Sequence, residues 1–209
     1  MPLILIEYYN EEYLWGLWQI SESADELINE VKNYEKVPEK ILSAIDKRKR
    51  EWAAARILLK QIVDYQGKQY TGTCYNETGC PVLVNSEDHI SISHSNEFVS
   101  VIVNTRKKVG IDIELINEKV LRVRDKFLSE REISEAGDKV SVLSTYWAIK
   151  EAIFKLYSGY SLNFRDQIYV HRVPDVNFGE IEAEVYIENQ VKLKMKFLRY
   201  RDYIITYNH

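Results

Sequence analysis

The chain of 209 residues contains only two cysteines, Cys74 and Cys80. Two thiols are too few for a disulfide framework, and they lack the four-ligand pattern of a structural zinc site. The sequence therefore favours a reducing compartment, and we expect a cytoplasmic protein.

Long apolar runs are also missing. The first residues, MPLILIEYYNEEY, contain a short apolar run, but no basic segment precedes it and acidic residues follow at once. This pattern is typical of neither a signal peptide nor a membrane span. We expect no membrane partner, and we interpret the run as a first β-strand.

The chain has no excess of positive charge, because 28 Lys and Arg residues stand against 32 Asp and Glu, giving a formal net charge of −4. A global basic surface for nucleic acid is therefore not expected. With 45% hydrophobic and 29% charged residues, the composition is that of a globular protein rather than a disordered or fibrous one.

Strand-like and helical segments alternate along the chain, which predicts an α+β fold. Residues 66–89 are rich in turn-forming residues, and a loop is expected there. The order of the elements suggests two similar halves, residues 1–105 and 106–209, although no sequence repeat proves a duplication. Strands are predicted at 3–9, 13–20, 89–93, 97–104, 109–115, 181–190, 191–200 and 202–208, and helices at 24–34, 39–65, 122–136 and 140–157.

The predicted strand 109–115 carries two carboxylates, Asp112 and Glu114, among alternating aliphatic residues. Because the side-chain period of a strand is two, both carboxylates face the same side. Their like charges repel each other unless a cation or basic side chains lie between them. The pair fits either an exposed polar face of the sheet or ligands of Mg²⁺, which prefers carboxylate and phosphate oxygens.

The segment YWAIKEAIFKLY, residues 146–157, predicts a helix with one buried apolar stripe. Its other face is either solvated, with a Glu151–Lys155 pair at i,i+4, or part of a site. Together with Asp112 and Glu114, this face supplies the carboxylates and lysines that a Mg²⁺ and phosphate site needs. In such a site lysine neutralises the phosphate oxygens. The stripe is Ala148, Ile149, Ala152, Ile153 and Leu156, and the other face is Trp147, Lys150, Glu151, Phe154 and Lys155.

In the segment ISISHSNEF, Ser91 and Ser93 share a strand face and His94 begins a turn. A Ser93–His94 nucleophilic pair is one interpretation, but neighbouring residues point in different directions and no G-x-S-x-G turn accompanies them. Hydroxyl and imidazole donors at the tip of a hairpin fit phosphate binding more easily.

Five segments in this order resemble the 4'-phosphopantetheinyl transferases of the Sfp type: GCP (79–81), ISISHSNEF (90–98), VGIDIE (109–114), KFLSEREI (126–133) and WAIKEAIFK (147–155). The resemblance implies two α/β subdomains related by pseudo-twofold symmetry, with the active site in the cleft between them, in a monomer. It implies transfer of the 4'-phosphopantetheine of coenzyme A to a serine of an acyl, peptidyl or aryl carrier protein, releasing 3',5'-ADP. The alternative is a coenzyme A or nucleotide binding module that has lost transfer.

The resemblance also implies roles for single residues. Mg²⁺, with Mn²⁺ as the alternative, is expected at Asp112, Glu114 and Glu151, and Glu151 is the implied base for the carrier serine. Lys155, with Lys150 nearby, is expected to steady the pyrophosphate. The implied coenzyme A contacts are Lys40, Arg56, Gly79, Cys80, Ser93, His94, Asp112, Lys150 and Lys155.

One position departs from the family pattern, because the usual Gly-Lys-Pro is Gly79-Cys80-Pro81 here. The change removes a positive charge, so the 3'-phosphate is expected to depend on other basic groups. The candidates are Lys40, Arg48 and Arg56. A solvated helix face is the simpler interpretation of the run KRKR at 47–50, and a structural role is the alternative for Arg56.

The segment VLRVRDKFLSEREI resembles the part of the family that borders the carrier-protein groove. Arg122, Arg124 and Lys126 are therefore candidate steering charges for an acidic carrier. The alternative for each is an ordinary amphipathic helix edge.

Overall fold

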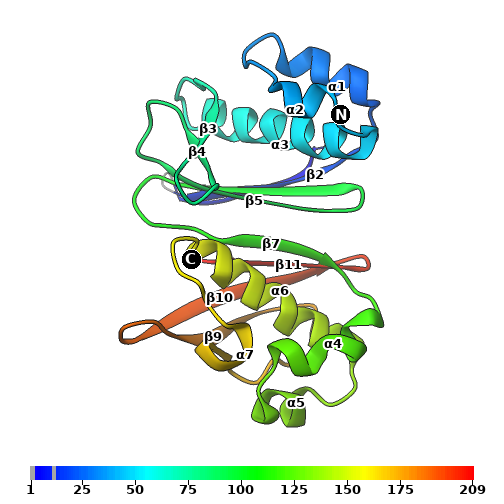
Figure 1. Ribbon diagram of the computed structural model, residues 1–209, viewed down its shortest axis with the longest axis vertical. Coiled ribbons are helices and arrows are strands. Elements are labelled where there is room, and N and C mark those ends of the chain that lie inside the picture. The colour runs from blue at the N-terminus through cyan, green and yellow to red at the C-terminus, as the bar shows by residue number, and fades with distance from the viewer. Residues whose placement is uncertain (1–2, 11–12) are drawn as a thin grey trace. The chain divides into compact units, whose positions relative to one another are not determined.

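The computed structural model describes residues 3–10 and 13–209, with side chains described from Tyr13 onward. The chain divides into two compact units, Met1–Val109 and Gly110–His209, shortly after the predicted boundary between residues 105 and 106. Each unit has its own sheet and helices (Figure 1). The predicted mixture of α and β structure is confirmed.

Unit 1 contains a four-stranded antiparallel sheet in the order β1-β2-β6-β5. Its strands are β1 (Leu3–Asn10), β2 (Tyr13–Gln19), β5 (His89–Ser95) and β6 (Phe98–Asn104), and its helices are α1 (Ala24–Val31), α2 (Glu39–Leu42) and α3 (Asp46–Tyr65). Helix α3 packs against β2 and β6. The predicted helix 39–65 is wrong at residues 43–45, where the chain leaves the helix although the break holds neither Gly nor Pro.

A short hairpin lies inside the segment predicted as a loop. Strands β3 (Thr73–Tyr75) and β4 (Pro81–Leu83) pair in antiparallel fashion. Glu35 anchors this segment, because its Oε1 accepts from the backbone N–H of Thr73 at 3.2 Å and its Oε2 accepts from the Tyr70 hydroxyl. The hairpin therefore has a fixed place against the α1–α2 connection.

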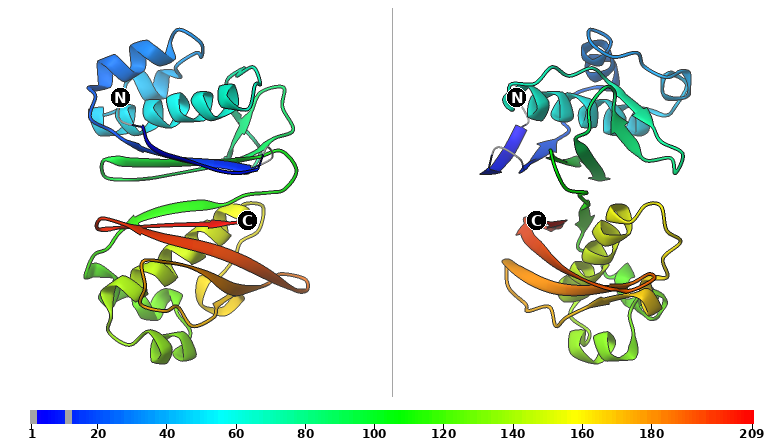
Figure 2. Two further views of the ribbon diagram at one scale, coloured as in Figure 1. Left: turned by 180° about the vertical axis from the view of Figure 1, so that it is seen from behind. Right: turned by 90° about the vertical axis from the view of Figure 1, so that its left-hand side faces the viewer.

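Unit 2 contains a five-stranded antiparallel sheet in the order β7-β11-β10-β9-β8. Helix α6 packs across β7 and β11, and α4 packs against α6 (Figure 2). The strands are β7 (Ile111–Leu115), β8 (Ile168–Val170), β9 (Phe178–Tyr186), β10 (Gln190–Tyr200) and β11 (Tyr203–Asn208), and the helices are α4 (Lys119–Phe127), α5 (Glu130–Ala136), α6 (Val140–Leu156) and α7 (Phe164–Gln167).

Small residues let α6 approach the sheet closely. A Cβ atom on Gly110 would lie 2.0 Å from the carbonyl oxygen of Ala152, so only glycine fits there. On the neighbouring strand, the Thr206 hydroxyl donates to the carbonyl oxygen of Ala148 at 2.8 Å. The predicted apolar stripe of α6 is buried as expected.

The predicted helix 122–136 is two helices, because Ser129 begins a new one. The Ser129 hydroxyl accepts from the backbone N–H of Glu132, and the Glu132 carboxylate accepts from the backbone N–H of Ser129 at 2.8 Å. This Ser-x-x-Glu capping box is a known start signal for helices, and it was readable in the sequence. In the part of the chain that the structure describes, no helix is long and apolar enough to cross a membrane.

Candidate active site

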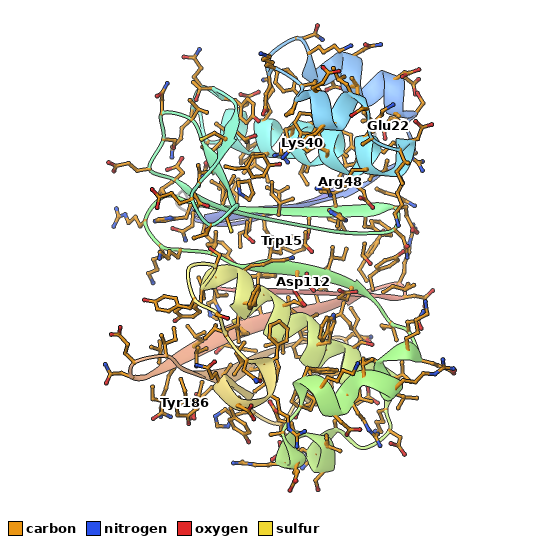
Figure 3. The ribbon with its side chains drawn as sticks, viewed as in Figure 1. Trp15, Glu22, Lys40, Arg48, Asp112 and Tyr186 are labelled. Atoms are coloured by element: carbon orange, nitrogen blue, oxygen red, sulfur yellow. The ribbon has the colours of Figure 1, made fainter. Side chains whose placement is uncertain are left out.

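Strand β7 and helix α6 bring together groups that lie 43 residues apart in the chain. The Lys155 ammonium donates to Oδ1 of Asp112 at 2.7 Å and to the carbonyl oxygen of Ile111 at 3.1 Å. Asp112 is only 3% exposed and lies on β7 beside α6 (Figure 3). The Asp112 carboxylate therefore faces the helix, not solvent.

Glu114 and Glu151 lie in the same electrostatic environment. Burial, together with the negative charge of Asp112, raises the pKa of Glu114 to about 7, and the hydrogen bond from Trp147 opposes that shift. Burial and the charge of Asp112 also raise the pKa of Glu151 to about 7, while Lys155 opposes it. The shared dependence on Asp112 indicates that the three carboxylates are close enough to repel one another.

This donor set fits a hard divalent cation in its chemistry, because Mg²⁺ takes carboxylate oxygens. Among the side chains that the structure describes, from Tyr13 onward, no three of His, Cys, Asp or Glu are already grouped to hold a metal ion. Oδ1 of Asp112 instead forms an ion pair with the Lys155 ammonium. Binding of a cation would therefore require Asp112, Glu114 and Glu151 to draw together, and the metal set stays a prediction.

The structure corrects the prediction for Lys150, which is completely buried and does not face a phosphate site. Its ammonium lies 2.8 Å from Oε2 of Glu132 and 2.7 to 2.9 Å from the carbonyl oxygens of Phe127, Phe164 and Ile168. Burial lowers its pKa, and Glu132 opposes the shift. Four acceptors surround three N–H groups, so Lys150 has no donor left for a ligand.

Sequence reasoning missed the role of Trp147, which it placed only on the mixed face of the helix. Its indole Nε1 donates to Oε1 of Glu114 at 3.1 Å. The Trp147 ring also packs against the rings of Phe127 and Phe164. The predicted neighbour Phe154 contacts Phe164 and remains 37% exposed.

In unit 1, the structure brings His94 and Arg48 together. Arg48 donates to Nε2 of His94 at 3.0 Å, and Nδ1 of His94 lies 3.6 Å from Oε1 of Glu51. His94 is an exposed residue of β5 rather than the start of a turn, and Ser93 beside it is buried. Arg48 is exposed on α3, as a solvated helix face predicts, and it contacts His94 as well.

A second basic cluster forms around Tyr75, which sequence reasoning did not select. The Lys40 ammonium lies 4.6 Å from the centre of the Tyr75 ring, and the buried Arg56 donates to the Tyr75 hydroxyl at 3.4 Å. Tyr75 pairs with Pro81 in the hairpin, so the turn with Cys80 follows directly. The backbone N–H of Cys80 donates to Oδ1 of Asn76 at 2.9 Å.

The basic residues of α4 are not equivalent. Arg122 and Lys126 are exposed. Arg124 forms an ion pair with Asp138 and donates to the carbonyl oxygen of Gly137 at 3.4 Å. Arg124 is therefore the least available of the three as a steering charge, and that role stays a prediction.

The family model of the 4'-phosphopantetheinyl transferase superfamily matches residues 108–207. The matched segment takes in nearly all of unit 2, which is therefore similar to this superfamily. The match includes the strand with Asp112 and Glu114 and the helix with Glu151 and Lys155, so the resemblance predicted from these motifs is confirmed.

A curated relative in this superfamily agrees with the match. The chain is 38% identical over 85 residues to the 4'-phosphopantetheinyl transferase gsp of Aneurinibacillus migulanus. The aligned part covers 38% of this chain and 35% of the relative, which is about a third of the relative's length.

Proposed function

We propose that the protein is a Mg²⁺-dependent 4'-phosphopantetheinyl transferase. It moves the 4'-phosphopantetheine of coenzyme A to a serine of an acyl, peptidyl or aryl carrier protein and releases 3',5'-ADP. The observation that carries this proposal is the gathering of Asp112, Glu114, Glu151 and Lys155 within the unit that is similar to the superfamily.

The proposed reaction is a displacement at the β-phosphorus of coenzyme A. The serine oxygen forms a bond to that phosphorus, the bond to the bridging oxygen breaks, and 3',5'-ADP leaves with the electron pair. Glu151 takes the serine proton, directly or through water. Lys155 donates to the pyrophosphate oxygens, on which negative charge develops.

Asp112, Glu114 and Glu151 would hold Mg²⁺, which when bound neutralises charge on the pyrophosphate. Lys155 already contacts Asp112, so the same ammonium can lie beside both the carboxylate and a phosphate oxygen. In this proposal Lys155 keeps its place while the ligand enters.

The basic groups of unit 1 are proposed to bind the 3'-phosphate and adenine end of coenzyme A. Arg48 and His94, which contact each other, form one cluster, and Ser93 precedes His94 in β5. Lys40 and Arg56 form the other, at the hairpin that carries Gly79 and Cys80. Four positive or neutral donors on α2, α3 and β5 compensate for the lysine that the family usually has at position 80.

The test is incubation of the protein with coenzyme A, Mg²⁺ and several purified apo carrier proteins, followed by mass spectrometry of each carrier. We expect one phosphopantetheine on at least one carrier. The alternative, a binding module that has lost transfer, predicts coenzyme A binding by calorimetry without a mass shift on any carrier.

A further inference from the structure

The geometry points to Trp147 as the positioning residue of Glu114: its indole N–H holds Oε1 of the carboxylate, so that Glu114 stays beside Asp112 and Glu151 and can turn its other oxygen to a divalent cation. The inference rests on the proposed metal site and deepens it. In this arrangement Glu114 can be a direct ligand, since Oε1 accepts from the indole and the other oxygen is left for the cation.

Trp147 and Glu114 are in direct contact. The distance from Nε1 of Trp147 to Oε1 of Glu114 is 3.1 Å, which is an ordinary N–H to oxygen hydrogen bond. An indole N–H can only donate, so it cannot compete for the cation. Glu114 is repelled by Asp112 and Glu151, and a neutral donor on one oxygen keeps it near them without adding a charge.

The indole is itself held in place by two aromatic rings. The ring centre of Trp147 lies 4.9 Å from that of Phe127, in an edge-on arrangement with an interplanar angle of 72°, and 5.6 Å from that of Phe164. Phe127 is buried. Packing of this kind restricts the rotation of the indole and so fixes the direction of its N–H.

The backbones of both aromatic residues are fixed by one buried group. The Lys150 ammonium donates to the carbonyl oxygens of Phe127 and Phe164 at 2.8 and 2.9 Å. Glu132 balances its charge at 2.8 Å. Lys150, which sequence reasoning assigned to phosphate, thus acts on the site through the support of Trp147.

The experiment measures Mn²⁺ binding to the full chain by titration calorimetry in the presence of coenzyme A. Trp147→Phe keeps a ring and removes the N–H. We expect Mn²⁺ affinity to fall by about tenfold, since loss of a group that orients a metal ligand costs roughly 10 to 100-fold. Coenzyme A affinity without metal stays unchanged. In turnover, KM for Mg²⁺ rises while kcat at saturating Mg²⁺ stays within about twofold.

Trp18→Phe is the matched control, because Trp18 is a buried indole of unit 1 whose N–H has no hydrogen-bond partner among the described residues. It should bind Mn²⁺ as the unaltered chain does. Equal Mn²⁺ affinity of Trp147→Phe and the unaltered chain would overturn the inference.

A double-mutant cycle keeps the inference testable if Trp147→Phe is poorly folded. Because Trp147 acts through Glu114, adding Trp147→Phe to Glu114→Gln should weaken Mn²⁺ binding no further than Glu114→Gln alone. Additive losses would mean that Trp147 acts independently, and the inference fails. If the unaltered chain takes up no Mn²⁺, the metal site of the proposed function fails together with this inference.

Discussion

Lys155 and the proposed cation share one carboxylate, Asp112, at 2.7 Å from the lysine. Removing the charge of a carboxylate from this group weakens the attraction for the lysine and for the proposed cation. Side chains of the site therefore act as a unit, and single substitutions are expected to cost far more in turnover than in stability.

The first prediction concerns Asp112→Asn and Glu151→Gln, which keep size and remove charge. We expect each to lower the rate of phosphopantetheine transfer by at least about 100-fold, the usual effect of losing a general base or metal ligand. The measurement is carrier mass over time. Glu182→Gln, an exposed residue of β9, is the control. Near-normal rates for both site variants would refute the assignment.

Cys80 is the position where a family lysine is replaced. Cys80→Lys should restore a charge beside Lys40 and Arg56 and tighten coenzyme A binding by up to about fivefold, since a partly exposed charge pair contributes up to about 1 kcal/mol. Calorimetry with Cys74→Lys, on the same hairpin, gives the control. An unchanged or weaker affinity for Cys80→Lys would mean that the missing charge is unimportant.

At the scale of elements, Lys150 joins the parts of unit 2. Its acceptors lie at the end of α4, in α5 and α7, and at the start of β8. The remaining oxygen of Glu132 accepts from the backbone N–H of Val170 at 2.9 Å. The ion pair thus ties four segments to α6.

Lys150→Met should lower the free energy of unfolding by about 3 to 5 kcal/mol, because it leaves the Glu132 charge buried without its partner. Urea denaturation measures this loss. Adding Glu132→Gln removes the unbalanced charge and should recover part of it. Lys194→Met, at an exposed lysine of β10, should change little. A loss below about 1 kcal/mol for Lys150→Met would contradict the buried pair.

The contact between β7 and α6 depends on Gly110. Gly110→Ala would force the helix and strand apart, and overpacking of this kind costs about 1 to 3 kcal/mol or more. Because Asp112 and Lys155 flank the contact, transfer should fall as well. Gly159→Ala, where nothing lies within 4 Å of the added Cβ, is the control for urea denaturation. Equal stability of the two variants would disprove the close contact.

For the whole molecule, the formal net charge is −4. To bind the proposed carrier, if that carrier is acidic, an acidic protein must rely on local basic groups for association. Arg122 and Lys126 are the exposed candidates on α4, since Arg124 is paired with Asp138.

Reversing both charges, in Arg122→Glu with Lys126→Glu, should raise KM for the carrier roughly tenfold at low salt and leave the affinity for coenzyme A unchanged. The difference should shrink at about 1 M salt, where charges are screened within about 3 Å. Arg172→Glu reverses an exposed charge elsewhere in unit 2 and serves as the control. An unchanged KM for the carrier after the charge reversal would exclude α4 as the docking edge.

The sequence by itself determined most strands, the carboxylate face of β7 and the apolar stripe of α6. These follow from periods of two and 3.6 residues within a single element. The Ser129–Glu132 capping box and the superfamily motifs were also local signals.

Only the tertiary structure decided which side chains on the other face of α6 are buried and what they contact. Periodicity placed Lys150 with Glu151 and Lys155, but other segments cover that side of the helix and bury Lys150 among their carbonyl oxygens. Only the tertiary structure likewise shows the hydrogen bond from Trp147 to Glu114 and the contact of the Lys40 ammonium with the Tyr75 ring. A pattern within one element cannot reveal acceptors supplied by segments far along the chain, and the burial of a charge depends on those acceptors.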